Sequence, residues 1–264
     1  MLTARRIAFV AQLAVTLAAC AFLIVPAVMS ALAGVTVNYF RGLSSGLTLK
    51  WIEEVWRLYA DSIGLSLQIA LSCLVITLLI GVPAAYALTK APKRIGRVID
   101  EIVALPVAIP GLALALALLQ LYGPWSAFRT SWLFILVGHV LYTLPFMIRA
   151  VSSVFAVIDL KTLEEGAATL GASPARRFLD VVVPNALPGI LAGSLTVVTL
   201  SVGEFNLTWM LHTPLTKTLP VGLADSYASM RLEIASAYTL VFFVMIAPLL
   251  LAMQLAAHRA SRGR

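Results

Sequence analysis

The sequence predicts an all-α membrane protein with six transmembrane helices, and three observations support this prediction. Of the 264 residues, 61% are hydrophobic and only 12% are charged, and the mean hydropathy is +0.97. A soluble domain averages about 45–50% apolar and about 25% charged residues. Apolar stretches long enough to cross a bilayer recur along the chain, separated by polar breaks. Because no low-complexity tract or linker divides them, we expect a single membrane domain over residues 1–264.

The six predicted spans cover residues 7–34, 62–88, 98–122, 132–156, 186–211 and 235–258. The first span follows Arg5 and Arg6, and its Leu17-Ala18-Ala19-Cys20 resembles a lipoprotein cleavage site. The apolar run continues well beyond that point, which favours an uncleaved span. Cys20 and Cys73 both lie inside apolar runs, so we expect small buried packing residues and not a disulfide framework or a metal site.

Residues 36–61 follow the first span and allow two interpretations. Trp51, Val55, Trp56 and Tyr59 could form one face of an interfacial helix, because tryptophan and tyrosine favour the membrane–water boundary. Alternatively, the segment is an extracytoplasmic linker anchored by its aromatic side chains. The sequence leaves both interpretations open.

The third and fourth predicted spans carry prolines and polar residues. Pro106, Pro110 and Gly111 predict a bend in the third span, either lining a pathway or made for packing. In the fourth span, His139 is followed by Tyr142, and an intramembrane histidine is more often a hydrogen-bonded packing residue than a ligand. Arg149, near the end of this span, is expected to snorkel toward the cytoplasm or to meet a partner there.

The fifth predicted span combines a close-packing pattern with a carboxylate. Gly189 and Gly193 form a G-x-x-x-G step, which serves either contact with another subunit or packing within this chain. Glu204 lies past the span centre, and a carboxylate inside a span is costly and by default functional. It either contacts solute or is a structural group paired with a neighbour. The candidate pathway residues are Glu204, Asn206, Ser201, Tyr142, His139 and Pro110.

The distribution of basic residues predicts the orientation. If both termini lie on one side, that side carries 13 of the 19 Lys and Arg residues and the other side carries 6. The positive-inside rule then places both termini, and the segment 159–184, in the cytoplasm. The net charge of +7 is explained by this asymmetry and by the contact of basic residues with lipid headgroups, so no nucleic-acid site is needed to explain it.

The segment 159–184 is the polar break that most resembles a device for contacting another protein. Asp159 is a helix cap, Gly171 a left-handed stop, and Ser173-Pro174 the start of a second helix that Pro184 interrupts. Two short helices with a turn at Gly171 are therefore predicted. Leu163, Ala167 and Leu170 share one face of the first helix, which suits docking into a groove of a partner.

This segment resembles the cytoplasmic "EAA" loop of the permease subunits of bacterial ABC importers. The family pattern is E-A-A, three residues, G, nine residues and I-x-L-P, and Glu165, Ala167, Gly171 and Pro184 occupy its anchor positions. Val181 and Val183 replace the usual Ile and Leu. Gly166 replaces the first Ala, which loosens the helix by roughly 1 kcal/mol. The resemblance covers residues from about 64 to 258.

The resemblance implies a transport mechanism and partners. An ATP-binding subunit would receive the loop in a surface groove, and two such subunits would act on the loops of two permeases. The second permease, identical or homologous, would complete the pathway, and an extracytoplasmic binding protein would deliver the solute. This chain has no G-x-x-x-x-G-K-[ST] phosphate loop, so Mg-ATP would bind to the partner ATPase and no cofactor to this chain. The implied coupling residues are Glu164, Glu165, Gly166, Ala167, Leu170, Gly171, Pro174 and Arg176.

The solute and two rival functions remain open. The segments around Glu204 and around Pro106 to Gly111 resemble the polyamine, aminoethylphosphonate and ferric-iron branch of these permeases, and Glu204 could face a cationic amine. One rival is an ATP-independent channel or ion-coupled carrier. The other is an intramembrane protease using Ser66 and His139, although Leu67 stands where a glycine usually follows such a serine.

Overall fold

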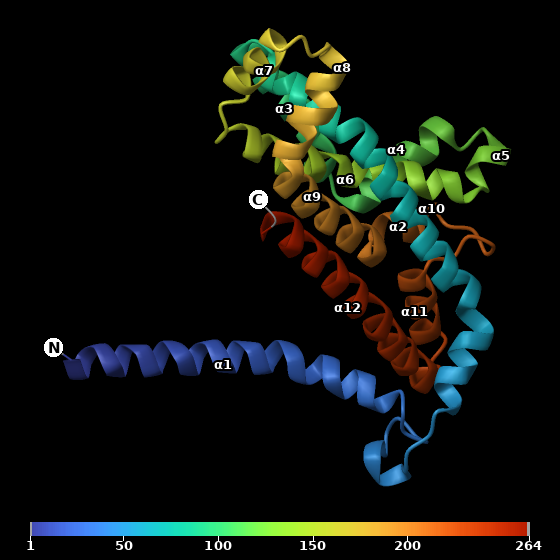
Figure 1. Cartoon of the computed structure of the whole chain (residues 1–264). Coiled ribbons are helices and arrows are strands. Elements are labelled where there is room, and N and C mark those ends of the chain that lie inside the picture. Colours follow the sequence, from blue (N-terminus) through green and yellow to red (C-terminus); the bar gives the residue numbers. More distant parts are fainter. Residues whose placement is uncertain (1, 263–264) are drawn as a thin grey trace. The chain divides into compact units, whose positions relative to one another are not determined.

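The computed structural model describes residues 2–262, and the side chains of residues 6–255. The all-α prediction is confirmed, because the described residues contain no strand and only an isolated bridge between Thr36 and Leu47. Five helices are long and apolar enough to cross a membrane, and the bent pair α3–α4 makes a sixth candidate (Figure 1). The predicted number of spans is therefore reached only if that bent pair is one span.

The elements run as follows in chain order: α1 (Leu2–Ala33), the 3₁₀ turn η1 (Gly42–Ser45), α2 (Lys50–Lys90), α3 (Lys93–Ala108), α4 (Gly111–Tyr122), α5 (Ser126–Arg129), α6 (Trp132–Phe155), α7 (Leu160–Thr169), α8 (Pro174–Arg176), the π-helical turn η2 (Arg177–Val182), α9 (Val183–Gly203), α10 (Asn206–Leu211), α11 (Leu219–Ala228) and α12 (Leu232–Arg262). The chain forms two compact units. The first contains residues up to 60 and 223–245, and the second contains 61–222 and the remainder.

In the first unit, the segment 36–61 has two parts, because residues 36–49 connect α1 to α2 and residues 50–61 are helical. These residues form the beginning of α2, continuous with the second span. Trp51, Val55 and Tyr59 recur every four residues and share one face of this helix, of which Val55 is fully buried, whereas Trp56 is 61% exposed. Trp51 donates its indole N–H to the carbonyl of Thr36 at 2.9 Å. Residues 50–61 are therefore not a separate interfacial helix, while residues 36–49 form a connection whose only helical element is the short turn η1.

The two cysteines have different surroundings. Cys73 of α2 is fully buried, which confirms its predicted packing role, and its Sγ lies 3.1 Å from the hydroxyl of Thr143. Cys20 is exposed on α1, so the prediction of burial is wrong for this residue. The physical reason is that an apolar helix can present all its sides to lipid, where an apolar side chain needs no protein partner.

In the second unit, the predicted third span is bent. The axes of α3 and α4 differ by 101° across the residues Ile109 and Pro110. Ile109 is extended, with φ −85° and ψ 130°, because the residue before a proline avoids the helical region. The predicted bend is confirmed, and it divides the predicted span into two helices.

Close packing of α9 against α6 answers the question left by Gly189 and Gly193. A Cβ added at Gly189 would lie 2.6 Å from the carbonyl oxygen of Ala150, and one added at Gly193 would lie 2.7 Å from the sulfur of Met147. Both neighbours belong to α6. The G-x-x-x-G step therefore serves packing within this chain.

The start of the fifth span differs from its prediction. Pro184 does not interrupt the helix, since residues 174–203 are helical throughout and form one candidate span. The wider π turn Arg177–Val182 directly precedes the proline. A π turn relieves the clash between a proline ring and the carbonyl four residues earlier, so the helix can continue. The second predicted helix of the segment 159–184 is thus the first part of this long helix.

Candidate functional site

The local geometry of the segment 159–184 follows its sequence. The Asp159 carboxylate accepts the backbone N–H of Thr162 at 3.2 Å and caps α7. Gly171 has φ +82°, the left-handed conformation that ends helices at low cost in glycine. Ser173 Oγ accepts the N–H of Arg176 at 3.4 Å, and Pro174 occupies the first turn of α8. The predicted caps and the turn at Gly171 are confirmed.

Glu164 anchors this segment to the end of α2. Its carboxylate is 6% exposed and accepts hydrogen bonds from the Tyr86 hydroxyl and from Lys90 Nζ, the latter at 2.9 Å. The Tyr86 ring also contacts Phe178, with ring centroids 5.3 Å apart. The loop is therefore joined to a transmembrane helix through an ion pair between the buried Glu164 and the half-exposed Lys90, and Glu164 points inward.

The electrostatics of Glu164 favour its ionised form. Burial opposes ionisation, but the hydrogen bonds from Tyr86 and Lys90 outweigh it and hold the pKa of Glu164 below its usual range. The positive charge of Arg177 acts in the same direction. Arg177 Nε is buried without a hydrogen-bond partner, and its side chain lines a cavity of about 390 Å³ beside Glu164. The charged carboxylate compensates this guanidinium.

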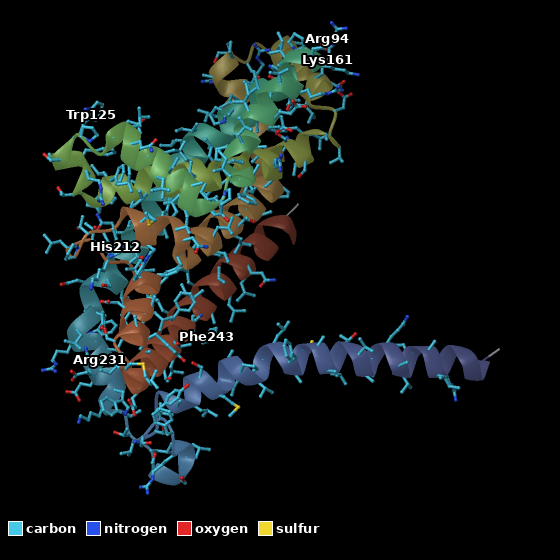
Figure 2. The ribbon with its side chains drawn as sticks, turned by 180° about the vertical axis from the view of Figure 1, so that it is seen from behind. Arg94, Trp125, Lys161, His212, Arg231 and Phe243 are labelled. Atoms are coloured by element: carbon cyan, nitrogen blue, oxygen red, sulfur yellow. The ribbon has the colours of Figure 1, made fainter. Side chains whose placement is uncertain are left out.

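The opposite side of the loop is exposed. The side chain of Glu165 is 66% exposed, and its nearest cation is Lys161 at 3.8 Å. Leu170 is 90% exposed and Leu163 is exposed as well, whereas Ala167 is half-buried. Figure 2 shows Lys161 of α7 and Arg94 of α3 at the same end of the second unit. This end thus presents an apolar surface with charged neighbours, as expected for a docking site.

The fifth span is broken at Glu204, which corrects the prediction of a helix over 186–211. Helix α9 ends at Gly203, Glu204 is extended, and the short helix α10 begins at Asn206. The Glu204 carboxylate accepts the N–H groups of Leu207 and Thr208, each at 2.8 Å, and the Thr208 hydroxyl at 2.7 Å. Glu204 therefore caps the helix that follows it, where the helix dipole also stabilises a negative charge.

His139 bridges the two sides of this break. Its Nδ1 lies 2.8 Å from Ser201 Oγ on α9, and its Nε2 lies 2.8 Å from Thr208 Oγ1 on α10. The side chain is 2% exposed. Because the Thr208 hydroxyl donates to Glu204, it must accept from Nε2–H, so Ser201 can donate to Nδ1 of a neutral ring. The predicted role of His139 as a hydrogen-bonded packing residue is confirmed.

A second charged group holds the other end of α10. Arg129 of α5 donates to the carbonyl oxygen of Leu211 at 2.8 Å, and a cation is favourable at a helix C-terminus. The first residue of α4, Gly111, lies against α10, since a Cβ added there would be 3.4 Å from the Cβ of Asn206. The break in the third span thus meets the break in the fifth, as Figure 1 shows for α4 and α10.

The structure brings together some of the predicted pathway residues and separates others. Ser201, His139 and Glu204 form one buried network, while Pro110 and Asn206 lie exposed where the two breaks meet. Tyr142 is half-buried and its ring contacts Phe146, away from this network. Ser66 accepts the N–H of Leu219 at 2.7 Å, so it does not form the serine–histidine pair that an intramembrane protease would need.

Sequence reasoning missed three residues that hold these sites. Tyr86 and Thr208 lie inside the predicted spans 62–88 and 186–211 and Lys90 follows the first of them, and hydropathy alone assigns these residues no further role. The spacing Tyr86-x-x-x-Lys90, which places both side chains on one helix face, was an available signal. Thr208, four residues after Glu204, was another, because a side chain can cap N–H groups three residues later.

The bent spans, the capped loop and the buried polar network describe a polytopic membrane transport protein. The family model described as "Binding-protein-dependent transport system inner membrane component" matches residues 77–262. The chain belongs to this family, the permease subunits of ABC importers.

Two relatives and two solved structures place the chain further. The "Putative 2-aminoethylphosphonate transport system permease protein PhnV" of Salmonella typhimurium is 31% identical over 81% of this chain and 80% of its own. The "Molybdenum transport system permease protein ModB" of Azotobacter vinelandii is 30% identical over 64% of this chain and 81% of its own. The fold is similar to a bacterial alginate ABC transporter, with a TM-score of 0.74, 14% identity, and coverage of 96% of this chain and 93% of that one. It is also similar to the MetNI methionine ABC transporter, with a TM-score of 0.64, 18% identity, and coverage of 80% and 98%.

Proposed function

We propose that this chain forms half of the translocation pathway of an ATP-driven importer in the bacterial cytoplasmic membrane. A second permease subunit completes the pathway, two ATPase subunits dock on the loops, and an extracytoplasmic protein delivers the solute. Both termini and the segment 159–184 lie in the cytoplasm, as the basic residues indicate. ATP binding and hydrolysis move the paired loops, and the spans alternate between inward-open and outward-open states.

The observation that carries this proposal is the two-sided construction of the loop. Glu164 fixes α7 to α2 through Lys90, while Glu165 and Leu170 on the same loop remain exposed. A force applied to the exposed residues is therefore passed to a transmembrane helix. A channel or ion-coupled carrier would have no use for such a construction, and it would conduct solute in liposomes without any ATPase.

A pair of matched leucine variants tests the docking surface. Leu170→Asp places a charge on the loop, and Leu215→Asp does the same at a residue of similar exposure, 92% against 90%, outside the loop. We expect Leu170→Asp to abolish co-purification of the ATPase and Leu215→Asp to preserve it. Glu165→Lys and Gly171→Pro should uncouple ATP hydrolysis from uptake in vesicles. Normal solute accumulation with these three loop variants would refute the proposal.

For the solute, we propose a small molecule carrying a tetrahedral oxyanion, with 2-aminoethylphosphonate as the leading example. The printed names of the two relatives support this class, because aminoethylphosphonate and molybdate share that chemistry. The structure removes one argument for a polyamine, since three hydrogen bonds already occupy the Glu204 carboxylate.

Thermal shifts of the cognate binding protein test this choice. A ligand at 100 times its Kd stabilises its receptor by roughly 2.7 kcal/mol, which is readily measured. We expect stabilisation by 2-aminoethylphosphonate or molybdate and none by spermidine. Stabilisation by spermidine alone would identify a cationic solute and return Glu204 to consideration as a contact residue.

A further inference from the structure

A second cavity lies between the end of α2, the first turns of α3, and α6. Its volume is about 490 Å³. It combines two guanidinium groups, one carboxylate and several hydroxyl groups, and its lining residues are Leu88, Thr89, Gly96, Arg97, Asp100, Arg149, Ser152 and Ser153. The transport mechanism proposed above assigns no role to this cavity.

The cations of this cavity have no partner of their own. Within the part of the chain that the structure describes, neither Arg97 nor Arg149 forms an ion pair, although Asp100 also lines the cavity. Both arginine side chains are exposed. Two guanidinium groups and one carboxylate leave a net positive charge, and arginine's planar fork matches the oxygen atoms of a phosphate group. The cavity is therefore suited to an anion.

An exposed apolar helix face runs along α3 beyond this cavity. The helix is amphipathic, with charged residues on one side and large aliphatic residues on the other. These aliphatic residues are exposed, namely Ile95, Val98, Ile99, Ile102 and Leu105. In a chain that lies within a bilayer, lipid acyl chains solvate such a face. The charged side of α3 thus lines the basic cavity, and the other side of the same helix carries the apolar face.

We propose that this cavity binds the phosphate group of an anionic phospholipid whose acyl chains lie along α3. Arg97 and Arg149 hold the phosphate, and the Ser152 hydroxyl supplies a further donor, whereas the Thr89 hydroxyl already donates to the carbonyl oxygen of Ala85. Basic cavities between transmembrane helices on the cytoplasmic side are suited to acidic headgroups. The lipid would brace the junction of α2 and α3 next to the docking loop. The proposal requires only that the chain spans a membrane and is independent of the transported solute.

Native mass spectrometry of the assembled transporter tests this site by counting retained lipids. Phosphatidylglycerol and phosphatidylcholine share a phosphate diester but differ in net charge. We expect the transporter to retain phosphatidylglycerol preferentially, and Arg97→Gln and Arg149→Gln each to weaken this retention about fivefold. Asp100→Asn, which removes the only carboxylate of the cavity lining, should strengthen retention.

Arg94→Gln provides the matched control. It removes the same charge from the first turn of the same helix, but Arg94 is not among the residues that line the cavity. We expect this variant to retain phosphatidylglycerol normally.

Four results would contradict the site. If Arg94→Gln loses as much phosphatidylglycerol as the two cavity variants, the lipid is held only by diffuse electrostatic attraction. If the transporter retains phosphatidylglycerol and phosphatidylcholine equally, the cavity does not recognise the headgroup charge. Inorganic phosphate that displaces the lipid at equal concentration would identify a free oxyanion, and absence of any bound lipid would indicate that a protein subunit covers α3. Each of these four results overturns the proposal.

Discussion

Two buried glutamates, one in the docking loop and one in the fifth span, use the same chemistry for different ends. Glu164 accepts hydrogen bonds from Tyr86 and Lys90, which lie 78 and 74 residues earlier in the chain. Glu204 accepts all its hydrogen bonds from Leu207 and Thr208, within four residues. The first carboxylate therefore joins two distant helices, whereas the second shapes the backbone next to it.

The difference indicates what each residue contributes to transport. Glu164 makes the loop and α2 move together, so its removal should loosen coupling between the ATPase and the spans. Glu204 maintains a break at which α9 ends and α10 begins, so its removal should disturb the membrane interior itself. Variants at these residues can confirm or contradict this division, and the effect on stability should be larger at Glu204.

Glu204→Gln should have the largest effect on stability. An amide has one acceptor oxygen and cannot satisfy both buried N–H groups of Leu207 and Thr208 together with the Thr208 hydroxyl. Losing a hydrogen bond to a charged acceptor costs about 1.5–3 kcal/mol. We expect a clear fall in the Tm of the purified transporter and a fall in uptake.

Asn206→Ala is the control for Glu204→Gln, because Asn206 is exposed in the same segment. It should leave the Tm unchanged. If Asn206→Ala lowers uptake without lowering the Tm, the exposed residue contacts solute at the meeting point of the two breaks. An unchanged Tm in Glu204→Gln would show that the carboxylate does not stabilise α10.

His139→Leu should have the next largest effect. It removes the bridge between Ser201 and Thr208, but Thr208 keeps its bond to Glu204, and Ser201 can turn to a carbonyl of its own helix. We expect a loss of about 1–2 kcal/mol in the free energy of unfolding. His139→Gln should recover part of that loss, because an amide can also bridge two hydroxyl groups. Tyr142→Phe on the same helix should change little, and a loss equal to that of His139→Leu would assign the effect to packing of α6.

Glu164→Gln should have a smaller effect on stability than either intramembrane variant. The amide keeps one hydrogen bond but loses the charge that compensates Lys90 and Arg177, a loss of about 1 kcal/mol. Glu165→Gln removes an exposed charge and should leave the Tm unchanged while reducing ATPase coupling. The opposite result, with the Tm lowered only by Glu165→Gln, would contradict the division of roles between these neighbours.

The pH dependence of stability follows from the same bonds. The pKa of Glu164 is lower in the folded chain than in an unfolded one, where a glutamate titrates at about 4.3. Its stabilising contribution is therefore complete above that value and is lost as the pH falls through the folded pKa. As the pH falls below about 4.3, the wild type should lose more stability than Glu164→Gln, as thermal unfolding scans would show. Parallel pH profiles would contradict the ion pair with Lys90.

The accuracy of the sequence predictions follows the range of the interactions. The caps at Asp159 and Ser173 and the turn at Gly171 depend on neighbouring residues, so the pattern alone predicts them. The anchor between Glu164 and Lys90 depends on tertiary packing, which no local pattern contains.

The break at Glu204 was missed for another reason. Residues 197–211 are apolar enough to extend a span, and hydropathy does not register where a helix ends. The bend at Pro110 was predicted because proline itself alters the backbone. At Glu204 the helix breaks because the carboxylate caps the N–H groups of residues 207 and 208. Hydropathy does not contain this interaction, so the break cannot be predicted from it.

The smallest effect, an increase in stability, is expected for Gly166→Ala. Gly166 lies within α7, and a Cβ added there would meet no atom within 4 Å. Alanine is therefore accommodated without a clash and should stabilise the helix by up to about 1 kcal/mol. Gly171→Ala also meets no atom, but its φ of +82° disfavours any side chain and should destabilise the loop. If Gly166→Ala raises the Tm and Gly171→Ala lowers it, glycine is required at residue 171 for its backbone conformation and is not required at residue 166. If Gly166→Ala raises the Tm but reduces uptake, α7 must stay flexible to transmit the motion.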